Sequence, residues 1–396
     1  MKTKRFSIIA ILIIVAVLAT ACSGGTAAPA ATPGGTAATT TATAKPTATA
    51  QPAGKVYKYT LQGCLAAPGT DNWERLEGSF IKYVDMITNG QVQISGHGPG
   101  EIVPFGEMST ATQQGTLDII EWLGYYDLGR DPTCALMCTA PFGLSGDVFQ
   151  SWMDSAGGYE LCESLYNQWN MHVISGYAGG TGQILGQTKK PYYGGMSEWK
   201  EKGLIIRSSG VQGDVYTKAG FQVVFISGGD LFTAAERGVV DVIEFGGPTW
   251  NWKYGYQEIC PYVYYPGWHE PATNLTFMMN MDRWNELPVD LQEKVALAGK
   301  ATRISNVPID QWETGVYLQK MVDYGCEFIK ISDADLAMMY DAKMDLFTEI
   351  AAGNARFKEM WDSMEAYRAE QDEVYRVLSD LSFDPSLSKW KSGQVS

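Results

Sequence analysis

Arg207 is the residue whose type and position most directly predict a chemical role. The apolar run 204–206 follows Lys202-Gly203, a pattern typical of a turn that leads into a short buried strand, and Arg207 stands where that strand ends. At the carboxyl end of a strand in an open α/β sheet, a planar guanidinium can bind a carboxylate through two parallel hydrogen bonds. The sequence makes Arg207 a candidate anion-binding residue; the alternative is an arginine that only faces solvent.

A carboxylate followed by an aromatic ring recurs in two similar stretches. Residues 110–122, TATQQGTLDIIEW, align without a gap onto residues 233–245, TAAERGVVDVIEF. Each copy predicts the end of an amphipathic helix, a glycine that stops it and a short apolar strand. A carboxylate that ends a buried strand needs a partner or a metal ion. We therefore expect two similar units facing each other across a ligand cleft, unless the junctions are alike by convergence. The residue pairs that end the two copies are Glu121-Trp122 and Glu244-Phe245.

Other candidate cleft residues lie outside the repeat. Tyr126 follows the first copy and is expected, with Glu121 and Trp122, on the first lobe's side of the cleft. Trp73 lies just past the first loop, where an aromatic ring can form a cleft wall, although a core position is the commoner one. The glycine-rich run 179–183 permits close backbone approach to a ligand. A wall or supporting layer is expected from Trp268 and His269, with a solvated His269 as the alternative.

The predicted elements would bring these residues to one cleft. A strand over 56–61, a helix over 72–88 and a further strand form a βαβ beginning, which predicts a mostly parallel sheet covered by helices. A strand over 172–176 is expected to cross into a second lobe, and a long helix over about 306–324 would form a spine. Residues 333–378 have helical spacing with an apolar stripe. The predicted fold class is α/β, with two lobes around a cleft, a spine helix and a helical C-terminus.

The amino terminus carries a predicted targeting signal. Three basic residues among the first five precede the apolar run 6–19, which is shorter than the ~20 residues that span a bilayer. Small residues then lead to Cys22, which predicts a lipoprotein signal peptide over 1–22 and a lipid-modified Cys22; an uncleaved anchor is the alternative. The Ala, Thr, Pro and Gly of residues 23–54 predict a disordered tether. The body is expected outside the cytoplasm, with lobe I over 55–175 plus about 248–280, lobe II over 176–247 plus about 281–330, and a helical segment over 331–396.

Composition excludes several classes of protein. The chain has 396 residues, of which 45% are hydrophobic and 19% charged, so it can bury large cores and is not a disordered protein. A net charge of −14 and the lack of a basic run argue against nucleic-acid binding. Six cysteines follow Cys22, and we expect one or more disulfides among them. Cys134 and Cys138 are spaced CxxxC, without a nearby histidine or second cysteine pair to support zinc.

Three motifs carry a resemblance to a known family: RSSG, GGDLFTAAERGVVDVIEFGGP and YVYYPGWHEP. With the chain from about Tyr57 to about Leu378, they resemble the DctP-type solute-binding subunits of tripartite ATP-independent periplasmic (TRAP) transporters. The similar branch binds 2-oxo or 2-hydroxy acids together with a metal ion. The resemblance implies a two-lobed periplasmic-binding-protein-like fold, a non-catalytic role in transport, a small organic acid as ligand and a membrane permease as partner.

The resemblance also implies roles for single residues. Arg207 matches the arginine that pairs with the substrate carboxylate, Glu244 matches the carboxylate ligand of the ion, and Phe245 stands where the family has a tryptophan that contributes its backbone carbonyl. The family's glutamine ligand aligns with Ile184. Gln183 can take this role, as a ligand of the ion and of the substrate, only if the alignment shifts by one residue, because adjacent strand residues face opposite ways. A hard cation such as Na⁺ or Ca²⁺ prefers oxygen ligands of this kind.

Two other functions fit parts of the sequence. Glu121 and Glu244 can be interpreted as the acid and nucleophile of a lipoprotein glycoside hydrolase, but no other hydrolase motif accompanies them. A binding protein for a neutral sugar or polyol would stack tryptophans on the ring, whereas Arg207 favours an acid. We expect an extracytoplasmic receptor, lipid-anchored or periplasmic, that captures a 2-oxo or 2-hydroxy monocarboxylate. Its C-terminal helix either packs on a second subunit, giving a homodimer, or packs on its own body.

Overall fold

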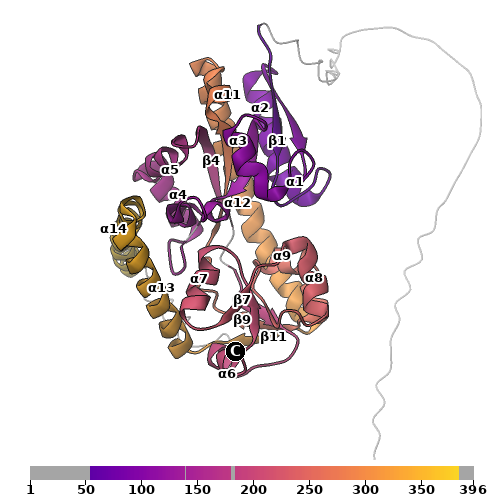
Figure 1. The fold of residues 1–396 in the computed structure, drawn as a ribbon, viewed down its shortest axis with the longest axis vertical. Helices are drawn as coiled ribbons and strands as arrows, with labels where there is room; N and C mark the ends of the chain where they lie inside the picture. Colours follow the sequence, from indigo (N-terminus) through magenta and orange to yellow (C-terminus); the bar gives the residue numbers. More distant parts are fainter. Residues whose placement is uncertain (1–53, 139, 180–182, 383–396) are drawn as a thin grey trace, which may run out of the picture. The chain divides into compact units, whose positions relative to one another are not determined.

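The computed structural model describes residues 54–138, 140–179 and 183–382. The predicted signal peptide with Cys22 and nearly all of the predicted tether lie outside these residues. Figure 1 shows two groups of elements, one above the other, and the long helix α12 (orange) extends along both.

The upper group, which we call the first lobe, is built on a sheet in the order β2-β1-β3-β10-β4. Strand β1 is parallel to β2 and β3, and β10 is antiparallel to both of its neighbours. Phe80 of α2 stacks on Phe277 of β10, with 4.3 Å between ring centroids, which joins the helix layer to the sheet. The strands are β1 (Tyr57–Gln62), β2 (Val92–His97), β3 (Ile119–Leu123), β4 (Met171–Gly179) and β10 (Thr273–Asn280). The helices are α1 (Asp71–Arg75), α2 (Glu77–Thr88), α3 (Met108–Gln113), α4 (Gly146–Ser155), α5 (Gly158–Asn167) and α11 (Met281–Asn285), with the 3₁₀ turns η1 (Phe105–Glu107), η2 (Gly124–Asp127) and η3 (Pro132–Met137).

The lower group, the second lobe, is built on a sheet in the order β11-β9-β5-β8-β6-β7. Strand β6 is parallel to β7 and β8, and β5 is antiparallel to β8 and β9. The strands are β5 (Gly186–Thr188), β6 (Ile205–Arg207), β7 (Gln222–Val224), β8 (Val242–Ile243), β9 (Tyr262–Tyr265) and β11 (Glu327–Lys330). The helices are α6 (Gly195–Glu201), α7 (Gly210–Lys218), α8 (Gly228–Glu236), α9 (Pro248–Lys253) and α10 (Tyr256–Ile259).

The two sheets share one topology, in which β1, β2, β3 and β10 of the first correspond to β6, β7, β8 and β5 of the second. The repeated stretches occupy equivalent places. Helices α3 and α8 are followed by Gly115 (φ 76°) and Gly238 (φ 73°), in the left-handed region that glycine adopts readily, and then by β3 and β8. Gln62 pairs with Ile120 as Arg207 pairs with Ile243. The structure therefore contains the two similar units that the repeat predicts.

The strands divide between the lobes differently from the expected boundaries. β9 lies in the second sheet, although 248–280 was expected in lobe I, so the chain returns to the first lobe only after Tyr265. β4 pairs with β10 as far as Gly179, beyond the expected boundary at 176. Membership of a sheet depends on which distant strand a segment pairs with, and a local hydrophobic pattern does not contain that information.

Helix α12 (Val289–Tyr324) contains the spine predicted over about 306–324 but begins earlier, and it is 36 residues long with Pro308 inside it. Its first turns belong to the first lobe, because Leu291 and Val295 pack in that lobe's core. Near its end, Met321 packs with Val263 of β9 in the second lobe. The predicted helical C-terminus is also confirmed, as α13 (Asp333–Gly353) and α14 (Ala355–Ser382).

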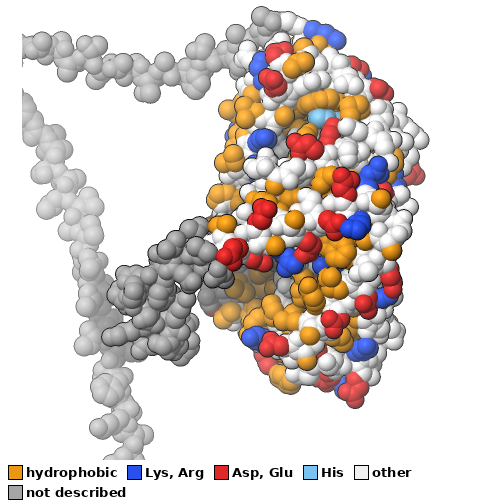
Figure 2. Space-filling view, turned by 90° about the vertical axis from the view of Figure 1, so that its left-hand side faces the viewer, with side chains coloured by type: hydrophobic (Ala, Val, Ile, Leu, Met, Phe, Trp, Pro, Cys, Tyr) orange, Lys and Arg blue, Asp and Glu red, His pale blue; other side chains and the backbone are white. Residues whose placement is uncertain are grey.

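The predicted disulfides are wrong for the folded body. The six cysteines after Cys22 are all free and buried, and four of them (Cys64, Cys134, Cys138 and Cys162) pack as small apolar side chains in the first lobe's core. None of the helices in the described residues has the length and hydrophobicity of a transmembrane span. On the face shown in Figure 2, acidic and basic side chains are interspersed and no basic patch forms there.

Candidate functional site

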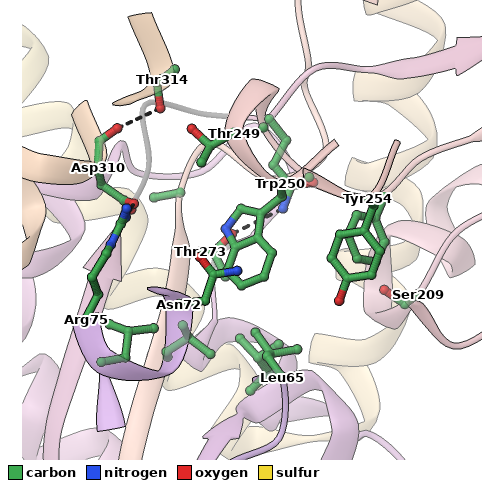
Figure 3. Close-up of a pocket in the computed structure, with 18 of the residues that line it drawn as sticks. Leu65, Asn72, Arg75, Ser209, Thr249, Trp250, Tyr254, Thr273, Asp310 and Thr314 are labelled. Carbon is green, nitrogen blue, oxygen red and sulfur yellow. Dashed lines mark hydrogen bonds and ion pairs between the residues drawn. The ribbon is translucent and has the colours of Figure 1, made fainter. Parts of the chain in front are cut away.

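A cavity of about 120 Å³ lies between the lobes (Figure 3). The first lobe lines it with Leu65, Leu76, Leu123 and Leu275. The second lobe adds Gln183, Arg207, Phe245 and Trp250, and α12 adds Asn306, Asp310 and Thr314. Both lobes and the spine therefore form its wall.

Arg207, at the end of β6, is held in place by backbone carbonyls. Its Nε donates to the carbonyl of Ile226 at 2.9 Å and its Nη1 donates to the carbonyl of Glu244 at 2.8 Å. The rings of Phe225 and Phe245 lie 5.7 and 5.2 Å from the guanidinium carbon. The residue is 4% exposed, and no described residue forms an ion pair with it. A buried cation whose only acceptors are neutral is suited to an anionic ligand.

Glu244 lines neither cavity, but it directly precedes the lining residue Phe245 and is joined to Gln183 through His269. The Nε2 atom of His269 is 3.2 Å from Glu244 Oε1 and 3.1 Å from Gln183 Oε1. Because both neighbours are oxygen acceptors, Nε2 carries a proton and donates to them. His269 is fully buried, and so the imidazole fixes two oxygen atoms that come from distant parts of the chain.

Two buried carboxyl groups at this place have opposite pKa shifts. Burial alone would raise the pKa of Glu244, but the neighbouring His269 and Arg207 hold it below its ordinary value, so this carboxylate is ionised at neutral pH. Burial and the charge of Glu244 raise the pKa of Glu270 to about 7. Glu270 accepts hydrogen bonds from Thr273 at 2.7 Å and from Gln212 at 3.0 Å, both compatible with a neutral or a charged acid.

The residues around Glu244 fit a hard cation. Oε2 of Glu244 is buried and accepts no hydrogen bond from a described residue, so it is an oxygen ligand without a partner. Gln183 supplies an amide oxygen beside it. No three His, Cys, Asp or Glu side chains in the described part of the chain are grouped to hold a metal. A cation here would therefore need backbone or ligand oxygens in addition to Glu244 and Gln183.

Comparison with known proteins identifies the family. Residues 66–354 match the DctP family, described as bacterial extracellular solute-binding protein, family 7. The chain belongs to this family. A monocarboxylate 2-oxoacid-binding periplasmic protein of Nostoc sp. (strain PCC 7120) is 29% identical over 321 residues, which are 80% of this chain and 87% of that protein.

Solved structures of TRAP periplasmic solute-binding proteins have the same fold as this DctP-family chain. The protein from Colwellia psychrerythraea, solved with bound calcium and pyruvate, is 28% identical with a TM-score of 0.75, covering 83% of this chain and 98% of that one. The protein from Pseudoalteromonas atlantica, solved with bound sodium and pyruvate, is 26% identical with a TM-score of 0.75, covering 86% of this chain and all of that one.

Gln183 and Ile184, the two candidates for the family's glutamine position, have different surroundings in this DctP-family structure. Gln183 lines the cavity and contacts His269, whereas Ile184 is buried in an apolar cluster with Val263 and Met321. Adjacent residues face opposite ways, as expected for extended chain.

Five further predicted site residues divide between the cavity and the cores. Tyr126 lines the cavity, as Phe245 does. Trp122 lines a neighbouring cavity of about 570 Å³ instead, on the other side of Tyr125 and Tyr126. Trp73 and Trp268 line neither cavity, because each is buried in a lobe's core.

Glu121 lines neither cavity and has a different environment from Glu244. It is 1% exposed, and its Oε2 accepts from the backbone N–H of Cys64 at 2.8 Å. Glu77 of α2 lies beside it. Burial and the neighbouring Glu121 carboxyl raise the pKa of Glu77 well above its usual range. The equivalent strand position thus holds a carboxyl pair in one lobe and a carboxylate with histidine in the other.

Sequence reasoning missed part of the cavity wall. Trp250 follows the FGGP motif with only Thr249 between them, and the aromatic-rich stretch 250–256 is a signal that could have identified it. Arg75 and Asp310 gave no such signal, because each lies on a helix whose pattern is ordinary and they meet only through the fold.

Proposed function

We propose that this DctP-family protein binds a 2-oxo or 2-hydroxy monocarboxylate, together with Na⁺ or Ca²⁺, for uptake through a TRAP permease. The observation that carries the proposal is the buried, immobilised Arg207 on the cavity wall. A ligand carboxylate that reaches this guanidinium gains charge-assisted hydrogen bonds and compensates a buried cation. The relatives solved with pyruvate and a cation support the same class of ligand.

The residues behind the cavity would support the cation. When bound, the cation would supply positive charge to the acid's oxygens. Glu244 and Gln183 present oxygen atoms, and His269 holds both in place. Phe245 packs against Arg207 and keeps water from its face. Because ligand contacts come from both lobes, binding would favour the closed arrangement that a permease recognises.

The competing functions receive less support. A glycosidase needs two carboxyl groups flanking the substrate, but Glu121 lines neither cavity. We therefore assign the protein no catalytic step. A neutral sugar or polyol would leave Arg207 without an anion, although Trp250 could stack on a ring.

The family indicates where the protein acts, and the sequence predicts how it is anchored there. Extracellular solute-binding proteins of this family act outside the cytoplasm. Anchoring through a lipid on Cys22, with residues 23–54 as a tether, is part of our proposal. A homodimer through the C-terminal helix α14 is a prediction that sedimentation of the purified body can test.

A thermal-shift screen tests the proposal. The protein without its signal peptide is heated with 2-oxo and 2-hydroxy monocarboxylates, sugars and polyols, each with chelator, Na⁺ or Ca²⁺. A binding acid at about 100 times its Kd should raise the Tm by about 5 °C or more, because a ligand of the folded state alone stabilises it. The rise should depend on a cation in wild type and lose that dependence in Glu244→Gln. Stabilisation by sugars alone would support the polyol receptor.

A further inference from the structure

The cavity contains a second arginine, and its environment differs from that of Arg207. Three charged side chains line the cavity in the described residues: Arg207, Arg75 and Asp310. Figure 3 shows Arg75 and Asp310 side by side at one side of the cavity and Tyr254 at the other. Tyr254 belongs to the Arg207 side, since its ring packs 4.9 Å from that of Phe245, which covers Arg207. The two arginines therefore lie at separate places on the wall.

Arg75 is neutralised by acidic side chains. Its Nη2 donates to Oδ1 of Asp310 at 2.7 Å, and its Nη1 forms an ion pair with Glu313. Glu313 also pairs with Lys253 at 3.5 Å, and Lys253 contacts Asn72 at 3.3 Å. The two cations and two anions of this cluster cancel, and the four side chains are between 17% and 19% exposed. A ligand at this side of the cavity meets no net positive charge and meets the carboxylate of Asp310.

Between these two places the wall is mostly apolar. Leu65, Leu76, Leu123 and Leu275 of the first lobe face Phe245 and Trp250 of the second. The volume of about 120 Å³ is close to the ~150 Å³ of a cavity that accommodates benzene. The neutral side chains of Asn72, Thr249 and Thr273 also line this part of the cavity (Figure 3). The space is suited to a short hydrocarbon chain, and no cation there compensates a second ionised group.

Building on the proposed function, we infer that the Arg75–Asp310 pair determines specificity by closing the distal side of the site to charge. The ligand's carboxylate binds at Arg207, and its uncharged apolar tail lies against the leucines and ends at Arg75–Asp310. A tail that ends in a second carboxylate is rejected, because Asp310 repels it and already occupies Arg75. Replacing Asp310 with asparagine leaves the cluster with one net positive charge and opens the site to dicarboxylates.

Two acids of equal size test this inference. 2-Oxopentanedioate and 5-methyl-2-oxohexanoate have the same number of non-hydrogen atoms, and the isopropyl end of the second has the shape of the distal carboxylate of the first. Isothermal titration calorimetry in saturating Ca²⁺ measures both. Wild type should bind the dicarboxylate about 100-fold more weakly than the monocarboxylate, as expected for an uncompensated charge in a largely buried site. Asp310→Asn should reduce that ratio by about tenfold or more.

Asp290→Asn is the matched control, because Asp290 lies on the same helix in an exposed ion pair with Lys294, 3.2 Å away, and lines neither cavity. It should leave the ratio unchanged.

Equal binding of the two acids by wild type contradicts the inference, and so does binding of neither by a protein that still binds a shorter 2-oxo acid. A folded Asp310→Asn variant with the wild-type ratio also contradicts it. If wild type binds no 2-oxo acid of any length, the proposed function itself fails. The comparison of the two acids on wild type tests the inference even if the Asp310→Asn variant does not fold.

Discussion

The two arginines of the cavity differ in the acceptors around them. Arg207 donates to two backbone carbonyls and keeps its charge available, whereas Arg75 is neutralised by Asp310 and Glu313. The sequence predicts Arg207, because a charged residue that ends an apolar strand is a local signal. It does not predict Arg75, whose partner Asp310 is 235 positions away.

His269 is predicted to position the cation ligands. Replacing it with leucine removes the N–H that holds Glu244 and Gln183, so the apparent affinity for Ca²⁺ in the presence of the acid should fall about 10–100-fold. Affinity for the acid at saturating Ca²⁺ should stay close to that of wild type. Calorimetric Ca²⁺ titrations at fixed acid concentration measure the first quantity and acid titrations the second.

His269→Gln, which retains a donor, should recover part of the Ca²⁺ affinity. His172→Leu is the matched control, since His172 pairs with Glu163 and stacks on Trp284 at the outside of the first lobe. An unchanged Ca²⁺ affinity in His269→Leu would mean that Glu244 and Gln183 hold their places without the imidazole.

At the scale of elements, the sequence predicts what is local and misses what depends on pairing. The gapless repeat identifies α3–β3 and α8–β8 correctly, because helix, glycine and strand follow from hydrophobic spacing and from the conformational freedom of glycine. The expected lobe boundaries differ from the sheets because β9 and β10 look alike as apolar strands and join different sheets. The environments of Glu121 and Glu244 differ because α2 places Glu77 beside one and the segment after β9 places His269 beside the other.

The carboxyl pair between α2 and β3 predicts a pH-dependent stability. Burial and Glu121 raise the pKa of Glu77 in the folded state. The protonated carboxyl therefore contributes its full share to the free energy of unfolding below the unfolded pKa of 4.5, and this contribution is lost as pH rises toward the folded pKa. The loss is about 1.4 kcal/mol for each unit by which the pKa is raised. Glu77→Gln removes this cost, so the variant should be more stable than wild type at pH 7.5 and should lose that advantage at pH 4. Urea unfolding at the two pH values measures the difference.

Glu74→Gln, on the exposed side of α1, controls for the loss of one negative charge and should show no such pH dependence. If Glu77→Gln changes stability equally at both pH values, the raised pKa of Glu77 does not contribute to folding.

At the scale of the whole molecule, one ionic cluster joins the two lobes through the spine. Glu313 of α12 binds Arg75 of α1 in the first lobe and Lys253 of α9 in the second. The fold class, the spine and the helical C-terminus are predicted from hydrophobic periodicity, but such a cluster is not, because its members come from three separate helices. It should help to keep the lobes closed.

Removal of Glu313 is predicted to loosen the closed form. In Glu313→Gln the acid should dissociate about two- to fivefold faster, as expected for the loss of partly exposed ion pairs worth about 0.5–1 kcal/mol. High salt should accelerate dissociation from wild type more than from the variant, because salt screens the cluster. Stopped-flow fluorescence of the cavity tryptophan Trp250 can follow the release. Glu349→Gln, which breaks an exposed ion pair with Lys218, should dissociate like wild type.

The central claim is that Arg207 binds the ligand's carboxylate, and calorimetry of Arg207→Met with a 2-oxo monocarboxylate in saturating Ca²⁺ tests it most directly. The account predicts that affinity falls about 100-fold or more, because the ligand's carboxylate loses the charge-assisted hydrogen bonds of the guanidinium, which the bound cation does not replace. Arg237→Met, an exposed change at the end of α8, should bind like wild type. A correctly folded Arg207→Met protein that binds the acid within about threefold of wild type would contradict the account.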